Sequence, residues 1–150
     1  MVEQGSLVYL VHCDSDVLLS LYEVLCAAGF EVAASSNARD TLEYIGRTKP
    51  RAVLCHWEMP ELGGAEFLER SRRSSPETRI IMTSRDADGP LVEDVRGRGG
   101  DDLLREPLSR LAVIDAVSRM LGFSVPYPSP DPAHAVKMDS GIGGIDRRER

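Results

Sequence analysis

The sequence lacks several features that define large classes of proteins. No apolar run approaches the roughly 20 residues that a membrane-spanning helix needs, and the chain does not begin with the basic residues and apolar core of a secretory signal. Clustered basic residues are also absent, and the net charge of -6 opposes general attraction to nucleic acid. We therefore expect a cytoplasmic protein that binds neither membranes nor nucleic acid.

Cysteine is scarce as well. Cys13, Cys26 and Cys55 are an odd number, and their spacing matches no zinc-finger pattern. We therefore expect reduced thiols, and for Cys26 and Cys55 we expect packing in the core.

Regular hydrophobic patterning is missing from the last part of the chain. Alternating prolines between residues 126 and 132 favour an extended chain, and the glycines at 141–144 add flexibility. Such a segment buries too little apolar surface to offset the entropy of ordering it. We expect one domain, residues 1–122, and a disordered tail, residues 123–150.

Within that domain, short β-prone runs alternate five times with segments whose apolar residues have helical spacing. The runs are residues 7–11, 30–34, 53–56, 79–83 and 101–104. This alternation predicts an α/β fold, in which a parallel sheet carries helices on both faces. Because such sheets place ligands at the carboxyl ends of their strands, the residues at those ends are the candidates for function.

Three segments at those ends carry a resemblance to a known family. They are Cys-His-Trp-Glu-Met-Pro-Glu-Leu-Gly-Gly at 55–64, Ile-Ile-Met-Thr-Ser at 80–84 and Gly-Asp-Asp-Leu-Leu-Arg-Glu-Pro at 100–107. Across about residues 7–121 the chain resembles the receiver domain of bacterial two-component response regulators. The resemblance implies a doubly wound, five-stranded parallel sheet with the flavodoxin-like (βα)5 topology.

The resemblance also places the family's phosphorylation site on residues of different chemistry. The phosphoacceptor aspartate falls on His56, and the phosphate-contacting lysine falls on Glu106. The pair of metal-holding acids falls on His12 and Cys13, with Asp14 one place late. These residues form what we predict to be a degenerate phosphorylation pocket.

The predicted loss of activity follows from the chemistry of phosphoryl transfer. An acyl phosphate requires a carboxylate nucleophile, and magnesium prefers carboxylate oxygens. The imidazole of His56 and the thiol of Cys13 provide neither, and the carboxylate of Glu106 would repel a phosphate. We therefore predict a pseudo-receiver that is not an enzyme and needs no magnesium.

The resemblance further suggests how the domain would meet a partner. The family's switch hydroxyl is kept as Ser84, whereas the aromatic residue that moves with it falls on Leu103. Family members bind partners, or dimerise, through the fourth helix, fifth strand and fifth helix, which correspond to about residues 92–121 here. We expect a protein partner or a homodimer contact at this surface. The residues that we assign to it are Val95, Leu103, Arg105, Arg110 and Leu111.

Three functions remain open at this point. The first is a phosphorylation-independent module for protein–protein interaction. The second is a ligand, transition-metal or pH sensor, because His12, Cys13 and His56 suit zinc, copper or iron and Glu106 can stabilise a protonated histidine. A polar cleft whose histidines merely form local hydrogen bonds is the simpler alternative. The third is a residual phosphoacceptor at His56 or Asp14.

Two local features can also be predicted. The resemblance implies a cis Glu106–Pro107 peptide bond, like the family's Lys-Pro bond. Trp57, the only tryptophan, follows His56 on a loop, where we expect it to cover the cleft.

Overall fold

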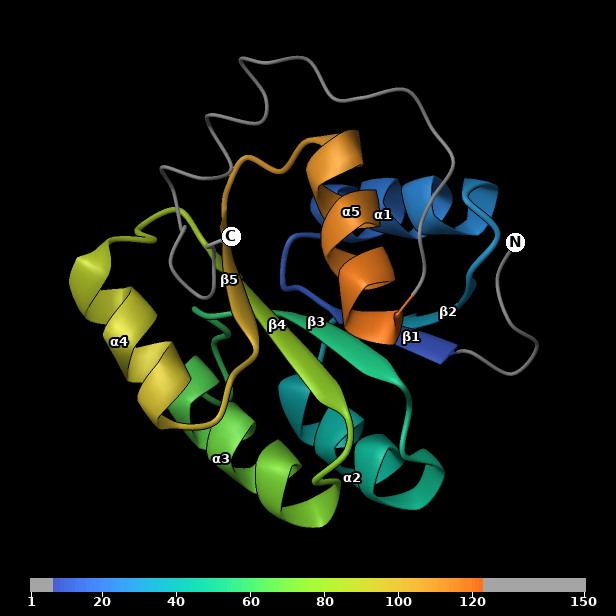
Figure 1. Ribbon diagram of the computed structural model, residues 1–150. Helices are drawn as coiled ribbons and strands as arrows, with labels where there is room; N and C mark the ends of the chain where they lie inside the picture. Colours follow the sequence, from blue (N-terminus) through green and yellow to red (C-terminus); the bar gives the residue numbers. More distant parts are fainter. Residues whose placement is uncertain (1–6, 123–150) are drawn as a thin grey trace.

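The computed structural model describes residues 7–122. One sheet of five parallel strands runs through it, in the order β2-β1-β3-β4-β5 (Figure 1). The strands are β1 (Leu7–Val11), β2 (Glu31–Ser35), β3 (Ala52–His56), β4 (Arg79–Ser84) and β5 (Asp102–Arg105). The predicted tail, residues 123–150, lies outside the described residues.

A helix follows each strand. The helices are α1 (Ser15–Ala27), α2 (Ala38–Thr48), α3 (Gly64–Ser74), α4 (Gly89–Gly97) and α5 (Arg110–Leu121). Asp14, Asn37, Asp88 and Ser109 cap α1, α2, α4 and α5 by accepting backbone N–H bonds from the first turn. Each cap satisfies a donor that the helix leaves unpaired and is typically worth about 1 kcal/mol.

The helices form a layer on each face of the sheet, with α1 and α5 on one side and α2, α3 and α4 on the other (Figure 1). Successive strand residues alternate between these layers. Val8 and Leu10 pack with α1 and α5, whereas Tyr9 and Val11 pack in the opposite core. The prediction of a doubly wound, five-stranded parallel sheet with this topology is therefore confirmed.

One of the two cysteines predicted to lie in the core needs correction. Cys26 is exposed. It directly follows Leu25 in α1, so its side chain points away from the face that buries Leu21 and Leu25. Trp57 is partly buried and packs against the core on the α3 side; that it covers the cleft stays a prediction. A Cβ atom at Gly64 would lie 2.5 Å from the Trp57 ring, so the glycine is what allows the indole to lie beneath the start of α3. Cys55 is fully buried, as predicted.

The described part of the chain contains no helix that is both long enough and apolar enough to cross a membrane.

Candidate functional site

The register of the sheet places two histidines side by side. Val11 of β1 pairs with Cys55 of β3, so His12 and His56 are the next residues along two neighbouring strands. Their imidazole rings stack with centroids 4.1 Å apart and an interplanar angle of 20°. Side-chain exposure is only 5% for His12 and 11% for His56, so both rings are largely withdrawn from water.

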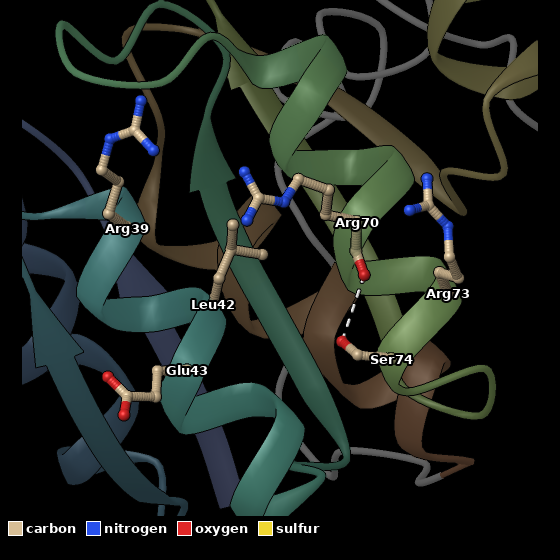
Figure 2. A pocket seen from close by; sticks show the side chains of 6 residues that line it. All are labelled: Arg39, Leu42, Glu43, Arg70, Arg73 and Ser74. Carbon is tan, nitrogen blue, oxygen red and sulfur yellow. Dashed lines mark hydrogen bonds between the residues drawn. The ribbon is translucent and has the colours of Figure 1, made fainter.

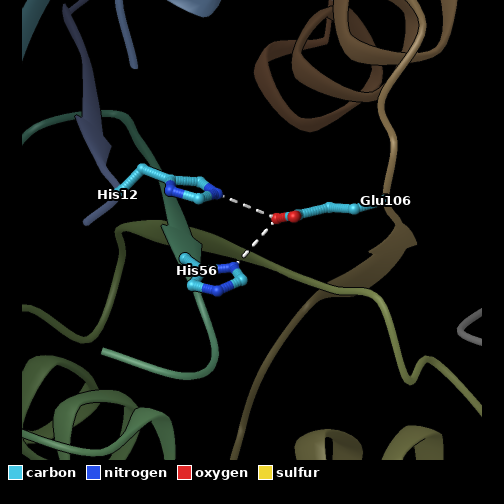
Figure 3. A group of neighbouring side chains, drawn as sticks. All are labelled: His12, His56 and Glu106. Carbon is cyan, nitrogen blue, oxygen red and sulfur yellow. Dashed lines mark hydrogen bonds and ion pairs between the residues drawn. The ribbon is translucent and has the colours of Figure 1, made fainter. Parts of the chain in front are cut away.

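Glu106, one residue beyond β5, reaches across to both rings (Figure 3). Its Oε2 lies 3.1 Å from His12 Nε2 and 2.9 Å from His56 Nδ1, and it also accepts a 2.6 Å hydrogen bond from the Thr83 hydroxyl. Burial raises the pKa of Glu106, but these three hydrogen bonds and the charge of His56 outweigh it and leave the pKa well below its ordinary value of 4.5. The site therefore contains a largely buried, ionised carboxylate.

The hydrogen-bond partner of His12 Nδ1 shows which nitrogen of the ring carries the hydrogen. The backbone N–H of Asp14 donates to His12 Nδ1 at 3.0 Å, so this nitrogen carries no hydrogen. The ring proton must then lie on Nε2, from which it is donated to Glu106. These two contacts hold His12 in the Nε2–H tautomer.

His56 has a different environment, because both of its nitrogens face carboxylates. Nδ1 contacts Glu106, and Nε2 lies 3.4 Å from Oε1 of Glu58. Burial lowers the pKa of His56, and so does the charge of Arg85. The hydrogen bond and charge of Glu106, with the charge of Glu58, raise the pKa by more. The net shift is upward from the ordinary value of 6.5, which favours a positively charged His56.

Ser84 joins this network through Glu58. Its hydroxyl donates to Glu58 Oε2 at 2.8 Å and accepts the backbone N–H of Asp86 at 3.0 Å. The hydroxyl that we predicted as a switch group is thus connected both to the pocket and to the segment that leads into α4.

Two residues of the predicted pocket lie outside the histidine–glutamate cluster. Cys13 is exposed, and its Sγ lies 3.9 Å from the backbone carbonyl oxygen of Glu58. The Asp14 carboxylate accepts the N–H groups of Asp16 and Val17. Asp14 therefore serves as the α1 cap, because the first turn of a helix needs acceptors for its free N–H groups.

Sequence reasoning missed two members of the network, Thr83 and Glu58. Thr83 pairs with His56 across β3 and β4, so the strand register could have identified it beside Ser84. No sequence signal pointed to Glu58, because its role depends on the path of an irregular loop.

A transition-metal site can be tested against this geometry. The donor atoms of His12, His56 and Glu106 all lie within 4.8 Å of one another. An imidazole binds metal through a lone pair in its ring plane, and two rings stacked at 20° do not direct their lone pairs at one point. In addition, His12 Nε2 carries a hydrogen, because Nδ1 accepts the Asp14 N–H. With Cys13 outside the cluster, these residues fit a hydrogen-bonded network and do not fit the transition-metal site that we considered from the sequence.

A separate groove of about 420 Å³ lies between α2 and α3 (Figure 2). Figure 2 shows the Arg70 guanidinium extending over Leu42 toward α2. Arg70 also pairs with Glu66 at 3.1 Å, and Arg39 donates to the carbonyl oxygen of Glu61 at 3.4 Å. The groove is lined mainly by exposed, charged side chains and shares no residue with the histidine network.

Comparison with known proteins decides the family. The response regulator receiver domain matches residues 8–118 of the chain. This chain belongs to the receiver family. The chemotaxis protein CheY of Thermotoga maritima is 25% identical over 117 residues, which cover 77% of this chain and 98% of CheY. A response regulator receiver protein of Anaeromyxobacter is 32% identical over 109 residues, covering 71% of this chain but only 45% of that longer protein.

Solved structures agree with this fold. A CheY-like receiver domain from Methanospirillum hungatei superimposes with a TM-score of 0.74 at 21% identity, covering 78% of this chain and 94% of that one. A response regulator from Chloroflexus aurantiacus gives 0.74 at 23% identity, covering 79% and 99%. At these identities the likeness shows the fold alone.

The receiver surface that we assigned to partners also needs correction. Val95 and Leu103 are fully buried, because both belong to the core between the sheet and the helices on the α4 side. Neither side chain can contact a partner in this conformation. Arg105 and Arg110 are exposed and Leu111 is half-buried, so these three remain available.

The Glu106–Pro107 peptide bond is cis, as the resemblance implied.

Proposed function

We propose that this receiver domain works without phosphoryl transfer, as a non-enzymatic module for protein–protein interaction. One observation carries the proposal: the ionised carboxylate of Glu106 lies against His12 and against His56, the residue on which the resemblance places the phosphoacceptor. A phosphoryl group arriving at His56 would meet this buried negative charge. Catalysis of phosphoryl transfer depends on stabilising negative charge on the transferred group, which Glu106 opposes.

The remaining residues support the same proposal. The side chain at position 56 is an imidazole in place of a carboxylate, and its Nδ1 is engaged by Glu106. Asp14, the alternative acceptor that we considered, is committed to capping α1. Each of the two candidate acceptors, His56 and Asp14, is therefore already engaged in hydrogen bonds.

Exposure to a small phosphodonor tests this directly. Incubation of the full chain with acetyl phosphate and magnesium should leave the intact mass unchanged. The matched positive control is the four-substitution variant with aspartate at 12, 13 and 56 and lysine at 106. A stoichiometric phosphoryl adduct on the unsubstituted protein would overturn the proposal.

For the partner surface, we propose the exposed part of α5 and the end of β5, around Arg105, Arg110 and Leu111. Arg105 donates to the carbonyl oxygens of Arg85 and Ala87 at 3.4 and 2.6 Å, so its replacement would disturb the loop before α4. Arg110 provides the cleaner test position, since it is exposed and lies at the first turn of α5.

Charge reversal at Arg110 should therefore weaken partner capture without affecting folding. Arg110→Glu should reduce the amount of a specific partner that co-purifies with the full chain by at least about tenfold, equivalent to about 1.4 kcal/mol. Arg73→Glu, on the outer side of α3, is the matched control and should retain capture. The same pair of variants measured by light scattering would reveal a homodimer at this surface. Equal behaviour of the two variants would place the contact elsewhere.

Sensing at the altered cleft remains a second candidate. It is favoured by one observation, the position of the His56 ring between the carboxylates of Glu58 and Glu106. The protonation of His56 therefore depends on how close these two carboxylates lie to the ring.

A further inference from the structure

The two histidines can share one additional proton, and the hydrogen bonds decide which ring takes it. Two imidazolium rings with centroids 4.1 Å apart would repel each other, so a single charge is favoured. His12 cannot take the proton while its Nδ1 accepts the Asp14 N–H. Both nitrogens of His56, by contrast, face carboxylate oxygens. The additional proton therefore belongs on His56.

This proton changes how His56 interacts with Glu58. Protonated His56 donates from Nδ1 to Glu106 and offers an Nε2–H to Glu58 Oε1, 3.4 Å away. Neutral His56 keeps the bond to Glu106 but turns an Nε2 lone pair toward the Glu58 carboxylate, so attraction becomes repulsion. The Glu58 side chain is 47% exposed, which lets it turn toward water when the proton leaves.

Movement of Glu58 would reach the start of α4. Glu58 Oε2 is the acceptor for the Ser84 hydroxyl, and the same hydroxyl accepts the Asp86 N–H. Asp86 is two residues before Asp88, the residue that caps α4. A continuous series of contacts thus joins the His56 ring to the segment between β4 and α4.

We propose that the altered cleft is a proton-binding site, in which one proton on His56 links Glu106 to Glu58 and thereby holds Ser84 and the segment before α4. Loss of the proton releases Glu58 and Ser84. This inference rests on the proposed function, because it assigns to a proton the regulatory position that a phosphoryl group has in a phosphorylated receiver.

The charged and titratable groups that face His56 follow four strands, and the charged ones set the direction of the equilibrium. Glu106 follows β5, Glu58 follows β3, His12 follows β1, and Arg85 follows β4. The two carboxylates raise the pKa of His56, whereas the charge of Arg85 lowers it. Removing Arg85 should consequently favour the protonated form, and removing the charge of Glu58 should favour the neutral form.

Nuclear magnetic resonance of the full chain tests the proposal. The chain has three histidines, and their ring signals can be assigned with His12→Asn and His134→Gln variants. The His56 ring should titrate with a midpoint above 6.5, the ordinary value, and the backbone amide of Asp86 should shift with the same midpoint. Arg85→Gln should raise that midpoint and Glu58→Gln should lower it. In Glu58→Gln, the Asp86 amide should no longer follow His56.

Glu61→Gln is the matched control, because Glu61 lies in the same loop and is exposed. Its His56 midpoint should equal that of the unsubstituted protein. A His56 midpoint at or below 6.5, an Asp86 amide that does not respond to pH, or equal effects of Glu58→Gln and Glu61→Gln would each overturn the proton site. These outcomes are independent of the acetyl phosphate experiment, so failure of the proton site and failure of the proposed function can be told apart.

Discussion

Replacing His12, Cys13 and His56 by aspartate and Glu106 by lysine should create a site that binds magnesium at millimolar concentration. The first three positions lie at the carboxyl ends of β1 and β3, where neighbouring strands bring their side chains together. Magnesium needs oxygens in near-octahedral geometry and retains several waters, so three converging carboxylates are sufficient protein ligands.

The present geometry supports that outcome. The Cys13 Sγ lies 3.9 Å from the Glu58 carbonyl oxygen, so an aspartate at position 13 would place its carboxylate beside another hard oxygen. Lysine at 106 would remove the negative charge that now lies against both histidines. Acetyl phosphate should then add one phosphoryl group to the aspartate at 56.

The magnesium affinity of the variant can be measured by titration. Binding is detected by calorimetry or by a change in the fluorescence of the single tryptophan, Trp57. The variant that carries the three aspartates but keeps Glu106 is the control. It should bind magnesium but give far less phosphoryl adduct, because it lacks the cation that offsets phosphate charge. A four-substitution variant that folds normally and binds no magnesium at millimolar concentration would show that these positions are not equivalent to the family's acid pocket.

Sequence patterns were sufficient to predict the sheet because its strands are short and all but β2 are mostly buried. Predicted strand 79–83 corresponds to Arg79–Ser84, and its apolar residues are fully buried. The second strand, predicted at residues 30–34, is Glu31–Ser35. Phe30 is buried in the core but precedes the ladder, in which Glu31 pairs with Leu7. Hydrophobicity alone does not distinguish a residue buried within a strand from one, such as Phe30, that is buried just before the strand begins.

The position of the site could be predicted from the sequence, but the hydrogen bonds between its side chains could not. The ends of β1 and β3 had to be neighbours in a sheet of this topology, which brought His12 beside His56. The direction of each side chain was not available, because it depends on loops without a periodic pattern. Cys13 illustrates this: one residue after the buried His12, its side chain is exposed.

Removing the carboxylate of Glu106 should produce the largest loss of stability in the pocket. Glu106→Leu would leave the donors on His12, His56 and Thr83 without their common acceptor. Each unsatisfied buried donor costs about 1–3 kcal/mol, and breaking a buried charged pair costs about 3–5 kcal/mol in total. We expect a decrease of about 3 kcal/mol in the free energy of unfolding, measured with urea. Glu106→Gln keeps an acceptor oxygen and should lose about half as much.

The pH dependence of stability distinguishes this charge network from simple packing. The pKa of Glu106 is lowered in the folded state, so its contribution is complete above its ordinary value of 4.5 and is lost as pH falls. The pKa of His56 is raised, so its contribution is complete below its ordinary value of 6.5 and is lost as pH rises through the folded-state pKa. The stability difference between the unsubstituted protein and Glu106→Gln should therefore be greatest between pH 4.5 and 6.5. A difference that stays constant across acid and alkaline pH would mean that Glu106 contributes through shape alone, because a packing contribution does not change with the protonation of His56.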